Sequence, residues 1–494
     1  MSSREPSSPK FRLRLLPVLI AAAVTSQAHA ADLWTITQDA LQNNSTLGAS
    51  RSSFQSVEAG RDVARGSLLP QIDATAQVTH NNTLESQSSS SAAGGAGTGG
   101  AGTSPGAEPE SSYNSTSAGL ELTQALYDAT SWAELEIAKR ETGQQALLLQ
   151  ADRQQLLYDV ASAYFEILRA HDVLEASISQ EKAIKRQLDQ AQEQFDVGLV
   201  ATTDVNEAQA SYDLARSQRI SAENDLQVSF EALERLTGKR YDSIDALSDD
   251  IPIESPEPAG RENWIQMAIA NNPEVQAAQA AVDVSRAEVE QAEAGHKPTL
   301  SAFANYNYSD SDQDYLDGHN GQTEVGLTAK LPIYRGGTTS AQVRQQTYTL
   351  EATQYDFEAQ RRDTTQQVRS LFTQVMNDVE SVEAQQQAIV SNRSALEATR
   401  SGYEVGTRNI VDVLDAEQAL YQAISDYADA RYTYVTDMVE LRQQAGVLDQ
   451  DVIRDLNQWL RETQTVTLHL PEDGGMSQME DIGERPTMEQ STTP

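Results

Sequence analysis

One turn motif occurs twice in this chain, and it constrains the fold more than any other feature. The first copy reads FDVGLVATTDV over residues 195–205, and the second reads YEVGTRNIVDV over residues 403–413. In each copy a long helical pattern stops at a glycine and restarts at Thr or Asn, ahead of an Asp. This pattern is typical of a helix that ends and is followed by an antiparallel partner. A chain that makes the same turn twice is expected to be an internal duplication.

Other matched segments extend the duplication over most of the chain. Ala40–Asn44 matches Ala268–Asn272, and the same offset holds as far as Pro70 and Pro298. The offset then changes where the first half carries an insert rich in Gly, Ser and Ala, at about residues 81–114. The sequence therefore predicts a first repeat at residues 31–240, a linker at 241–261 and a second repeat at 262–450.

The first 30 residues have the layout of a cleavable secretory signal. Lys10, Arg12 and Arg14 precede an apolar run from Leu15 to Val24, and Ala28-His29-Ala30 supplies a cleavage site. The apolar run is shorter than the ~20 residues that a membrane-spanning helix needs. A buried N-terminal helix is the alternative interpretation. We predict an exported protein, with residues 1–30 as its signal peptide and no transmembrane helix.

The charge and the composition of the chain exclude several classes of function. A formal charge of −37 makes nucleic acid an unfavourable partner. The chain has no cysteine, so it has neither a disulfide nor a thiol nucleophile. Its six histidines are scattered, without a zinc motif or a Ser-His-Asp pattern, and its Gly-rich insert lacks the features of a phosphate loop. We therefore predict a protein that is not an enzyme and that needs no cofactor.

Two segments are expected to form helices far longer than those of ordinary globular proteins. Neither Ser131–Asp196 nor Ser340–Glu404 contains proline, and apolar residues recur in both at intervals of three and four. At 1.5 Å per residue, each helix would be roughly 100 Å long. The periodicity predicts a coiled-coil-like assembly. Shorter helices are expected at about residues 33–66, 203–237, 263–294 and 410–445.

Four other segments alternate polar and apolar residues, which predicts strands with one apolar face. These strands lie at about residues 70–80, 115–126, 299–308 and 323–333. Each is near the ~9–11 residues that a tilted strand needs to cross a bilayer. A small soluble sheet packed on the helices is the alternative. Since four strands cannot close a membrane barrel, and an open edge is not tolerated in lipid, strands in a membrane would require several chains to share one barrel.

The segments outside the repeats are expected to be largely irregular. The linker contains several acidic residues together with Pro252, Pro256 and Pro258. The C-terminal segment, residues 451–494, is polar, and we predict that it is largely disordered.

The secretory signal, the duplicated halves, the two strand pairs and the long helices together resemble the TolC outer-membrane efflux family. The most specific matches are Gly198–Ala201 followed by Asp204-Val205, Tyr403–Arg408 followed by Ile410–Ala416, and Leu331–Gly337. The resemblance spans about residues 32–450. It implies a mixed α + β membrane protein, in which a homotrimer forms a 12-stranded β-barrel with four strands from each chain. The barrel would be continuous with a long periplasmic α-helical barrel.

The resemblance also implies a function and a set of partners. The protein would be an exit duct in the outer membrane of a Gram-negative bacterium, for tripartite drug efflux, type I protein secretion or both. The implied partners are a periplasmic membrane-fusion adaptor, an inner-membrane RND, ABC or MFS transporter that supplies the energy, and outer-membrane lipid. A periplasmic coiled-coil adaptor or a surface stalk without a pore is the alternative, and dependence on detergent would distinguish the two.

By the same resemblance, the two glycine turns would lie at the periplasmic tip, where a latch keeps the channel closed. Tyr403 would bond Asp204 within a chain, and Arg408 would reach Thr203 and Asp204 of a neighbouring chain. The planar fork of donors on Arg suits such a bridging role. The alternative for each residue is an ordinary solvated group at a helix end.

Two further groups of residues at the tip are candidates for function. Asp412 and Asp415 are spaced i, i+3 and share a helix face. In a trimer they would form two acidic rings at the entrance, which would favour cations and offer a place for a divalent ion. A solvated acidic face is the alternative, and no other metal site is predicted. The candidate contacts with an adaptor are Gly198, Leu199, Gly406 and Thr407, where glycine permits close approach of another backbone but is equally expected as a plain helix cap.

Overall fold

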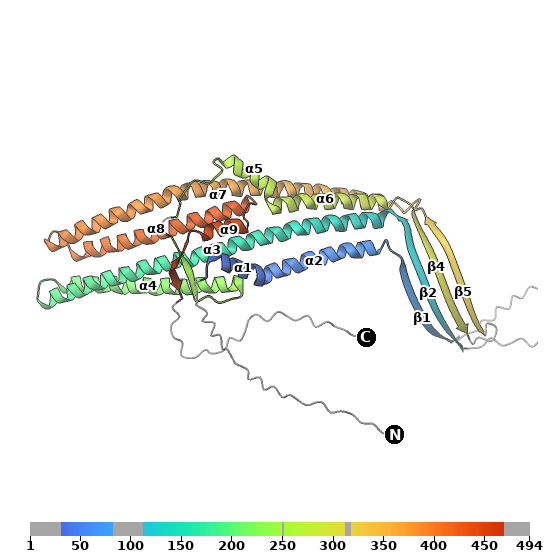
Figure 1. The fold of residues 1–494 in the computed structure, drawn as a ribbon, viewed down its shortest axis with the longest axis horizontal. Helices are drawn as coiled ribbons and strands as arrows, with labels where there is room; N and C mark the ends of the chain where they lie inside the picture. Colours follow the sequence, from blue (N-terminus) through green and yellow to red (C-terminus); the bar gives the residue numbers. More distant parts are fainter. Residues whose placement is uncertain (1–30, 83–111, 249–250, 312–317, 469–494) are drawn as a thin grey trace, which may run out of the picture.

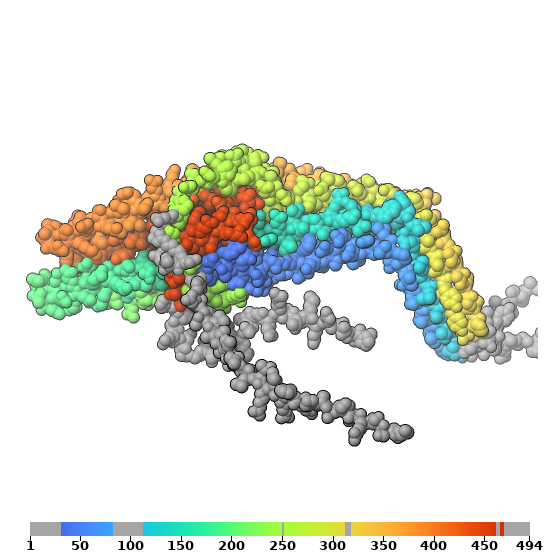
Figure 2. Space-filling view, viewed as in Figure 1, coloured from blue at the N-terminus to red at the C-terminus, as the bar shows by residue number. Residues whose placement is uncertain are grey.

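The computed structural model describes residues 31–82, 112–248, 251–311 and 318–468. The predicted signal peptide and most of the insert at 81–114 therefore lie outside the described residues. The chain is an elongated rod with a sheet at one end and two helix turns at the other (Figure 1). Figure 2 shows that the sheet bends away from the axis of the helices. Among the residues described, no helix has the length and apolar character needed to cross a membrane.

Two helices run almost the whole length of the helical part. Helix α3, Ala129–Asp196, has 68 residues and α7, Thr338–Glu404, has 67. Each reverses into a shorter antiparallel partner, α4 (Thr202–Thr237) after α3 and α8 (Ile410–Gln444) after α7. Helix α3 also packs against α8, which joins the two hairpins side by side. These bounds confirm the predicted long helices and their partners.

The part of the rod between its middle and the sheet is completed by two broken helices. Both predicted helices, at 33–66 and 263–294, are interrupted by an asparagine, Asn44 or Asn272. Each asparagine side chain accepts hydrogen bonds from the backbone of the helix that follows, and this local bonding favours a new helix start over continuation. The resulting helices are α1 (Leu33–Asn43), α2 (Ser45–Gly66), α5 (Arg261–Asn271) and α6 (Pro273–Ala294).

The predicted strands form one antiparallel sheet in the order β1-β2-β4-β5. Their bounds are Gln71–Asn82 for β1, Ser112–Asp128 for β2, Thr299–Ser311 for β4 and Gly318–Lys330 for β5. In the sheet as described, β1 and β5 are the two edges. Apolar side chains on both edge strands are exposed, among them Ile72, Val78, Val325 and Leu327.

The hydrophobic core is thickest in the middle of the rod, where the two hairpins meet the shorter helices. Trp264, Tyr164, Phe165, Leu33 and Ile36 are all buried there. The hydroxyl of Tyr164 donates a hydrogen bond of 2.6 Å to the backbone oxygen of Asp245. This bond attaches the helical core to the segment that links the two halves of the chain.

The structure corrects the expectation that the linker and the C-terminal segment are irregular. Strand β3, Ser243–Leu247, pairs antiparallel with β6, Leu460–Thr467. Helix α9, Gln450–Asn457, precedes β6 and buries Ile453 and Leu456. The burial of these apolar side chains supplies a stabilisation that polar composition alone does not predict. The expectation of disorder is therefore wrong for residues 450–467, whereas residues 469–494 lie outside the described part.

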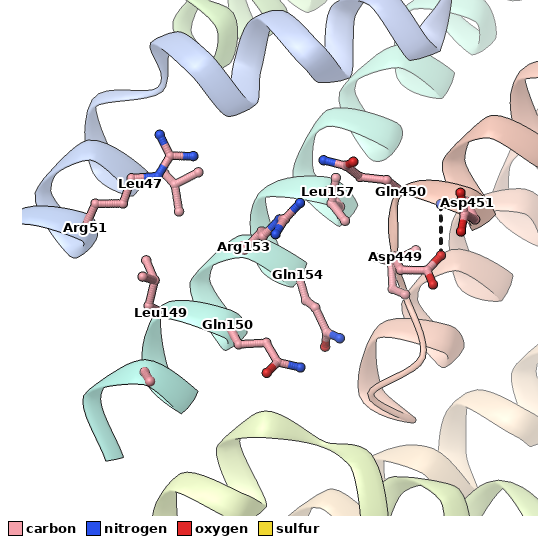
Figure 3. Close-up of a pocket in the computed structure, with 12 residues that line it drawn as sticks. Leu47, Arg51, Leu149, Gln150, Arg153, Gln154, Leu157, Asp449, Gln450 and Asp451 are labelled. Atoms are coloured by element: carbon pink, nitrogen blue, oxygen red, sulfur yellow. Dashed lines mark hydrogen bonds between the residues drawn. The ribbon is translucent and has the colours of Figure 1, made fainter. Parts of the chain in front are cut away.

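A cavity of about 570 Å³ lies where α9 meets α2 and α3. Figure 3 shows Arg51, Arg153 and Gln154 on the helical walls and Asp449 at the start of α9. The carboxylate of Asp449 accepts a hydrogen bond of 3.0 Å from the backbone nitrogen of Asp451, and this bond caps α9. The cavity is built by the docking of α9 and contains none of the predicted tip residues.

Candidate functional site at the helix turns

The two turns that end α3 and α7 have the same backbone geometry. Gly198 and Gly406 adopt φ angles of 77° and 76°, a left-handed conformation in which a side chain would be strained. In the first turn the nitrogen of Leu199 donates to the oxygen of Gln194 at 2.8 Å. In the second the nitrogen of Thr407 donates to the oxygen of Gly402 at 2.8 Å. Both turns therefore end their helix by the same glycine-based cap.

The helices that follow the turns begin differently. Helix α4 starts after Ala201 without a side-chain cap. Helix α8 starts with a capping box, in which Asn409 accepts from the nitrogen of Asp412 at 2.8 Å and Asp412 accepts from the nitrogen of Asn409 at 3.1 Å. One carboxylate oxygen of Asp412 is therefore used to start the helix, while Asp415 is exposed. The Asn-x-x-Asp spacing in the sequence is typical of this capping arrangement.

Tyr403 has a different partner from the one expected. Its hydroxyl donates a hydrogen bond of 2.9 Å to Oε1 of Gln194, in the last turn of α3. This bond ties the end of α7 to the end of α3, whereas the predicted partner was Asp204. Burial and the nearby charge of Asp204 raise the pKa of Tyr403. Asp204 lies in the first turn of α4, where its carboxylate accepts from the hydroxyl of Thr203 at 3.4 Å and suits the helix dipole.

Arg408 makes no ion pair within the part of the chain that the structure describes, and its side chain is exposed. Its aliphatic stem lies on Gly402, because a Cβ atom at Gly402 would be only 2.8 Å from Cγ of Arg408. The absence of a Cβ atom at Gly402 lets the stem of Arg408 pack closely against the end of α7. The guanidinium is left free to meet a group outside this chain.

Near the turns lies a buried carboxylate, Glu417, which the sequence analysis did not identify. Glu417 on α8 has no exposed surface. Its Oε1 accepts from Nη2 of Arg400 on α7 at 2.5 Å and from Nε2 of Gln187 on α3 at 3.2 Å. Glu417 occupies an apolar position between Val413 and Leu420 in the periodic pattern of α8. A lone charged residue in such a stripe is the signal that could have identified it.

Apolar packing surrounds these polar contacts. One cluster joins α3, α4 and α8 through Ile184, Leu188, Ala191, Ala208, Ala215, Ile410 and Leu414. At the turns themselves, by contrast, apolar side chains face solvent: Val197 is 70% exposed, Leu199 75% and Val405 75%. The predicted contact residue Thr407 is also exposed and donates its hydroxyl to the oxygen of Gly402. Among the described residues, no group of side chains has the arrangement of a metal site.

Comparison with known proteins gives a family match over most of the chain. The sequence model of the family described as Outer membrane efflux protein matches residues 36–239 and 264–447. The chain is 34% identical to the outer membrane protein TolC of Escherichia coli (strain K12), over 90% of this chain and 88% of that protein. It is 31% identical to the alkaline protease secretion protein AprF of Pseudomonas aeruginosa, over 68% of this chain and 71% of that protein.

Solved structures of similar shape agree with the fold described above. The chain matches CusC with a TM-score of 0.71 and 17% identity, over 89% of this chain and 99% of that one. It matches the outer membrane protein VceC of Vibrio cholerae with a TM-score of 0.69 and 17% identity, over 84% of this chain and 96% of that one. At this identity the likeness supports the fold alone.

Proposed function

This chain belongs to the outer membrane efflux protein family, and we propose that it is an exit duct in the outer membrane of a Gram-negative bacterium. The duct serves drug efflux, type I protein secretion or both. The observation that carries the proposal is the joining, in one chain, of an apolar-faced sheet to helices of 68 and 67 residues that end in two linked turns. A sheet at one end suits a membrane, and a helical rod of roughly 100 Å suits the space beneath it.

The open edges of the sheet support assembly of several chains. Strands β1 and β5 are both edges and both carry exposed apolar side chains. Unpaired backbone groups are not tolerated in lipid, so the edge of one chain must pair with the opposite edge of another. Three chains with four strands each would close a 12-stranded barrel, and their helices would surround one duct. Such a homotrimer would be inserted in outer-membrane lipid through the apolar faces of its strands.

The remaining partners are those that membership of the family implies. Energy for transport through the duct would be supplied by an inner-membrane RND, ABC or MFS transporter, joined to it by a periplasmic adaptor. The exposed turns are the proposed adaptor contact, with Leu199 as the apolar element and the glycines Gly198 and Gly406 permitting close approach. Thr407 completes this surface.

The tip carries the proposed latch. Within a chain, Tyr403 holds α7 to α3 through Gln194. Between chains, the free guanidinium of Arg408 would bind Thr203 and Asp204 of a neighbour. Exposed ion pairs are worth ~0–1 kcal/mol each, and threefold symmetry repeats the contact. Asp412 and Asp415 would line the entrance behind this latch and favour cations.

Planar-bilayer conductance tests both the duct and the latch. The mature protein would be compared with Arg408→Ser, Asp204→Ala and the control Arg362→Ser, which changes an exposed arginine of α7 far from the turns. We expect small, cation-preferring steps from the unchanged protein and the control, and markedly larger steps from the two latch variants. Steps of equal size in all four proteins would remove Arg408 and Asp204 from the latch. A folded, detergent-extracted protein that gives no steps would refute the duct.

A further inference from the structure

The cavity beside α9 contains none of the residues assigned to the duct or its latch, and its lining suits an acidic ligand with apolar flanks. Its volume is about 570 Å³. Two cations line it, Arg51 of α2 and Arg153 of α3, and Figure 3 shows them on the walls made by these helices. These two residues are called the cavity arginines below. The apolar part of the lining is formed by Leu47, Leu149, Leu157 and Leu448.

Neither cavity arginine is paired with a carboxylate in the described part of the chain. Nη2 of Arg51 donates a hydrogen bond of 2.9 Å to the backbone oxygen of Leu41, which is a neutral acceptor. Arg153 makes neither a hydrogen bond nor an ion pair within the described ranges. A guanidinium group binds a carboxylate through two parallel hydrogen bonds. Two such groups at one cavity, in a chain of formal charge −37, therefore favour an acidic occupant.

The two acidic side chains of the cavity lining are already engaged at the start of α9. The carboxylate of Asp449 accepts from the backbone nitrogens of Asp451 and Val452, at 3.0 and 2.9 Å. Asp451 forms an ion pair of 2.6 Å with Arg454, one turn further along the helix. Since both carboxylates serve α9 itself, the charge of the cavity arginines is left for a group from elsewhere.

An acidic segment of the same chain follows the cavity closely in the sequence. Residues 469–494, which lie outside the described part, contain six acidic residues and one arginine. Within them, residues 479–482 read Met-Glu-Asp-Ile, with two carboxylates between two apolar side chains. Residues 468–480 can span up to ~40 Å when extended. The intervening α9 and β6 have eight residues each, or about 12 Å and 26 Å, so this stretch can reach back to the cavity.

We propose that residues 479–482 bind in the cavity of their own chain. The carboxylates of Glu480 and Asp481 bind the cavity arginines, and the flanking apolar side chains lie on the leucines of the lining. The bound stretch joins α9 to α2 and α3, and its tether gives it an advantage over free anions through its high effective concentration. This inference is independent of the proposed duct, because no step of it involves transport.

Cross-linking between introduced thiols tests the proposal, since the chain contains no cysteine. Gly483→Cys places one thiol next to the acidic stretch, and Gln150→Cys places the other at the cavity. In the control pair, Asp152→Cys replaces Gln150→Cys, because Asp152 is an exposed residue of α3 that does not line the cavity. The full mature protein would be treated with a short bis-maleimide at pH 7.5, and mass spectrometry would measure cross-links within one chain.

We expect the cavity pair to cross-link about ten-fold faster than the control pair at low salt. The ratio of the two rates should fall towards one in 1 M NaCl, because salt screens the ion pairs. Arg153→Glu should also bring the ratio close to one, and Glu480→Lys/Asp481→Lys in the same chain should restore it. Arg362→Glu, which reverses an exposed charge on α7 away from the cavity, should leave the ratio unchanged.

Three results would overturn the proposal. The first is a ratio near one in the otherwise unchanged chain, which would leave the cavity to a free anion or to an acidic partner. The second is a high ratio that persists in Arg153→Glu or that the reversed stretch does not restore. The third is cross-linking between chains alone. If Arg153→Glu does not fold, Arg153→Gln replaces it, and the proposal then requires a fall of about three-fold in the ratio.

Discussion

Replacing Asp437 with Asn should stabilise the folded protein at pH 7.5 and change its stability little at pH 4. Asp437 on α8 lies against Asp378 on α7, and Oδ2 of Asp378 is buried without a hydrogen-bond partner among the described residues. Burial and the charge of Asp378 raise the pKa of Asp437 from 3.8 to about 6. The neighbouring Glu440 accepts a hydrogen bond from Tyr158 of α3 at 3.3 Å, and burial raises its pKa as well.

The sign and the size of the expected change in stability follow from the pair Asp437 and Asp378. Because the pKa of Asp437 is higher in the folded protein, its favourable contribution is present below the unfolded pKa and is lost as the pH rises through about 6. One pKa unit corresponds to ~1.4 kcal/mol, so a rise from 3.8 to about 6 would correspond to roughly 3 kcal/mol at pH 7.5 before screening by solvent. Asp437 is half-buried, and solvent screening reduces this to about 1 kcal/mol. Asparagine removes that cost because it carries no charge.

Thermal unfolding of the detergent-solubilised protein, followed by circular dichroism at pH 4 and pH 7.5, measures the effect. We expect Asp437→Asn to raise Tm by about 1–2 °C at pH 7.5 in a chain of this size. The matched control is Asp429→Asn on the same helix, which loses a 2.8 Å ion pair with Arg169 and should lower Tm slightly. A rise of equal size at both pH values, or a fall at pH 7.5, would refute the reasoning from the carboxylate pair.

Three other substitutions test the packing described above, each by the change in Tm. Gly446→Ala should destabilise the protein by about 3 kcal/mol or more, since φ is +73° and a Cβ atom would overlap the backbone of Asn271; a neutral result would refute the close approach. Asn272→Ala removes the cap of α6 and should cost about 1–2 kcal/mol. Tyr164→Phe leaves the backbone oxygen of Asp245 without its buried donor and should cost about 1–2 kcal/mol, whereas an unchanged Tm would mean that water replaces the hydroxyl.

The long helices and their turns could be predicted because their signals are local and continuous. Apolar residues at intervals of three and four mark stretches of α3 and α7, and Gly198 and Gly406 end these helices by a backbone geometry that favours glycine. The four strands of the larger sheet could be predicted equally well, since alternation of polar and apolar residues is a property of the segment itself.

The partners of individual side chains could not be predicted in the same way. Whether Tyr403 bonds Gln194 or Asp204 depends on distances between elements, which no pattern within one helix contains. The same holds for Glu417, whose hydrogen-bond partners Arg400 and Gln187 come from two other helices. Strand β6 was missed for a related reason, because it is stabilised by pairing with β3, more than two hundred residues earlier in the chain.

The two-stranded sheet of β3 and β6, in the middle of the rod, determines where the described chain can fray. Ala31 bridges Ile244 of β3 in parallel, and β6 pairs with the same strand. The first and last described segments are thus fastened side by side, roughly midway between the strands and the turns (Figure 1). Neither end of the rod holds the first or the last segment of the described chain, so loosening of either of these segments would begin at the centre. The strands of the four-stranded sheet and the two helix turns are in this way separated from the first and last segments of the described chain.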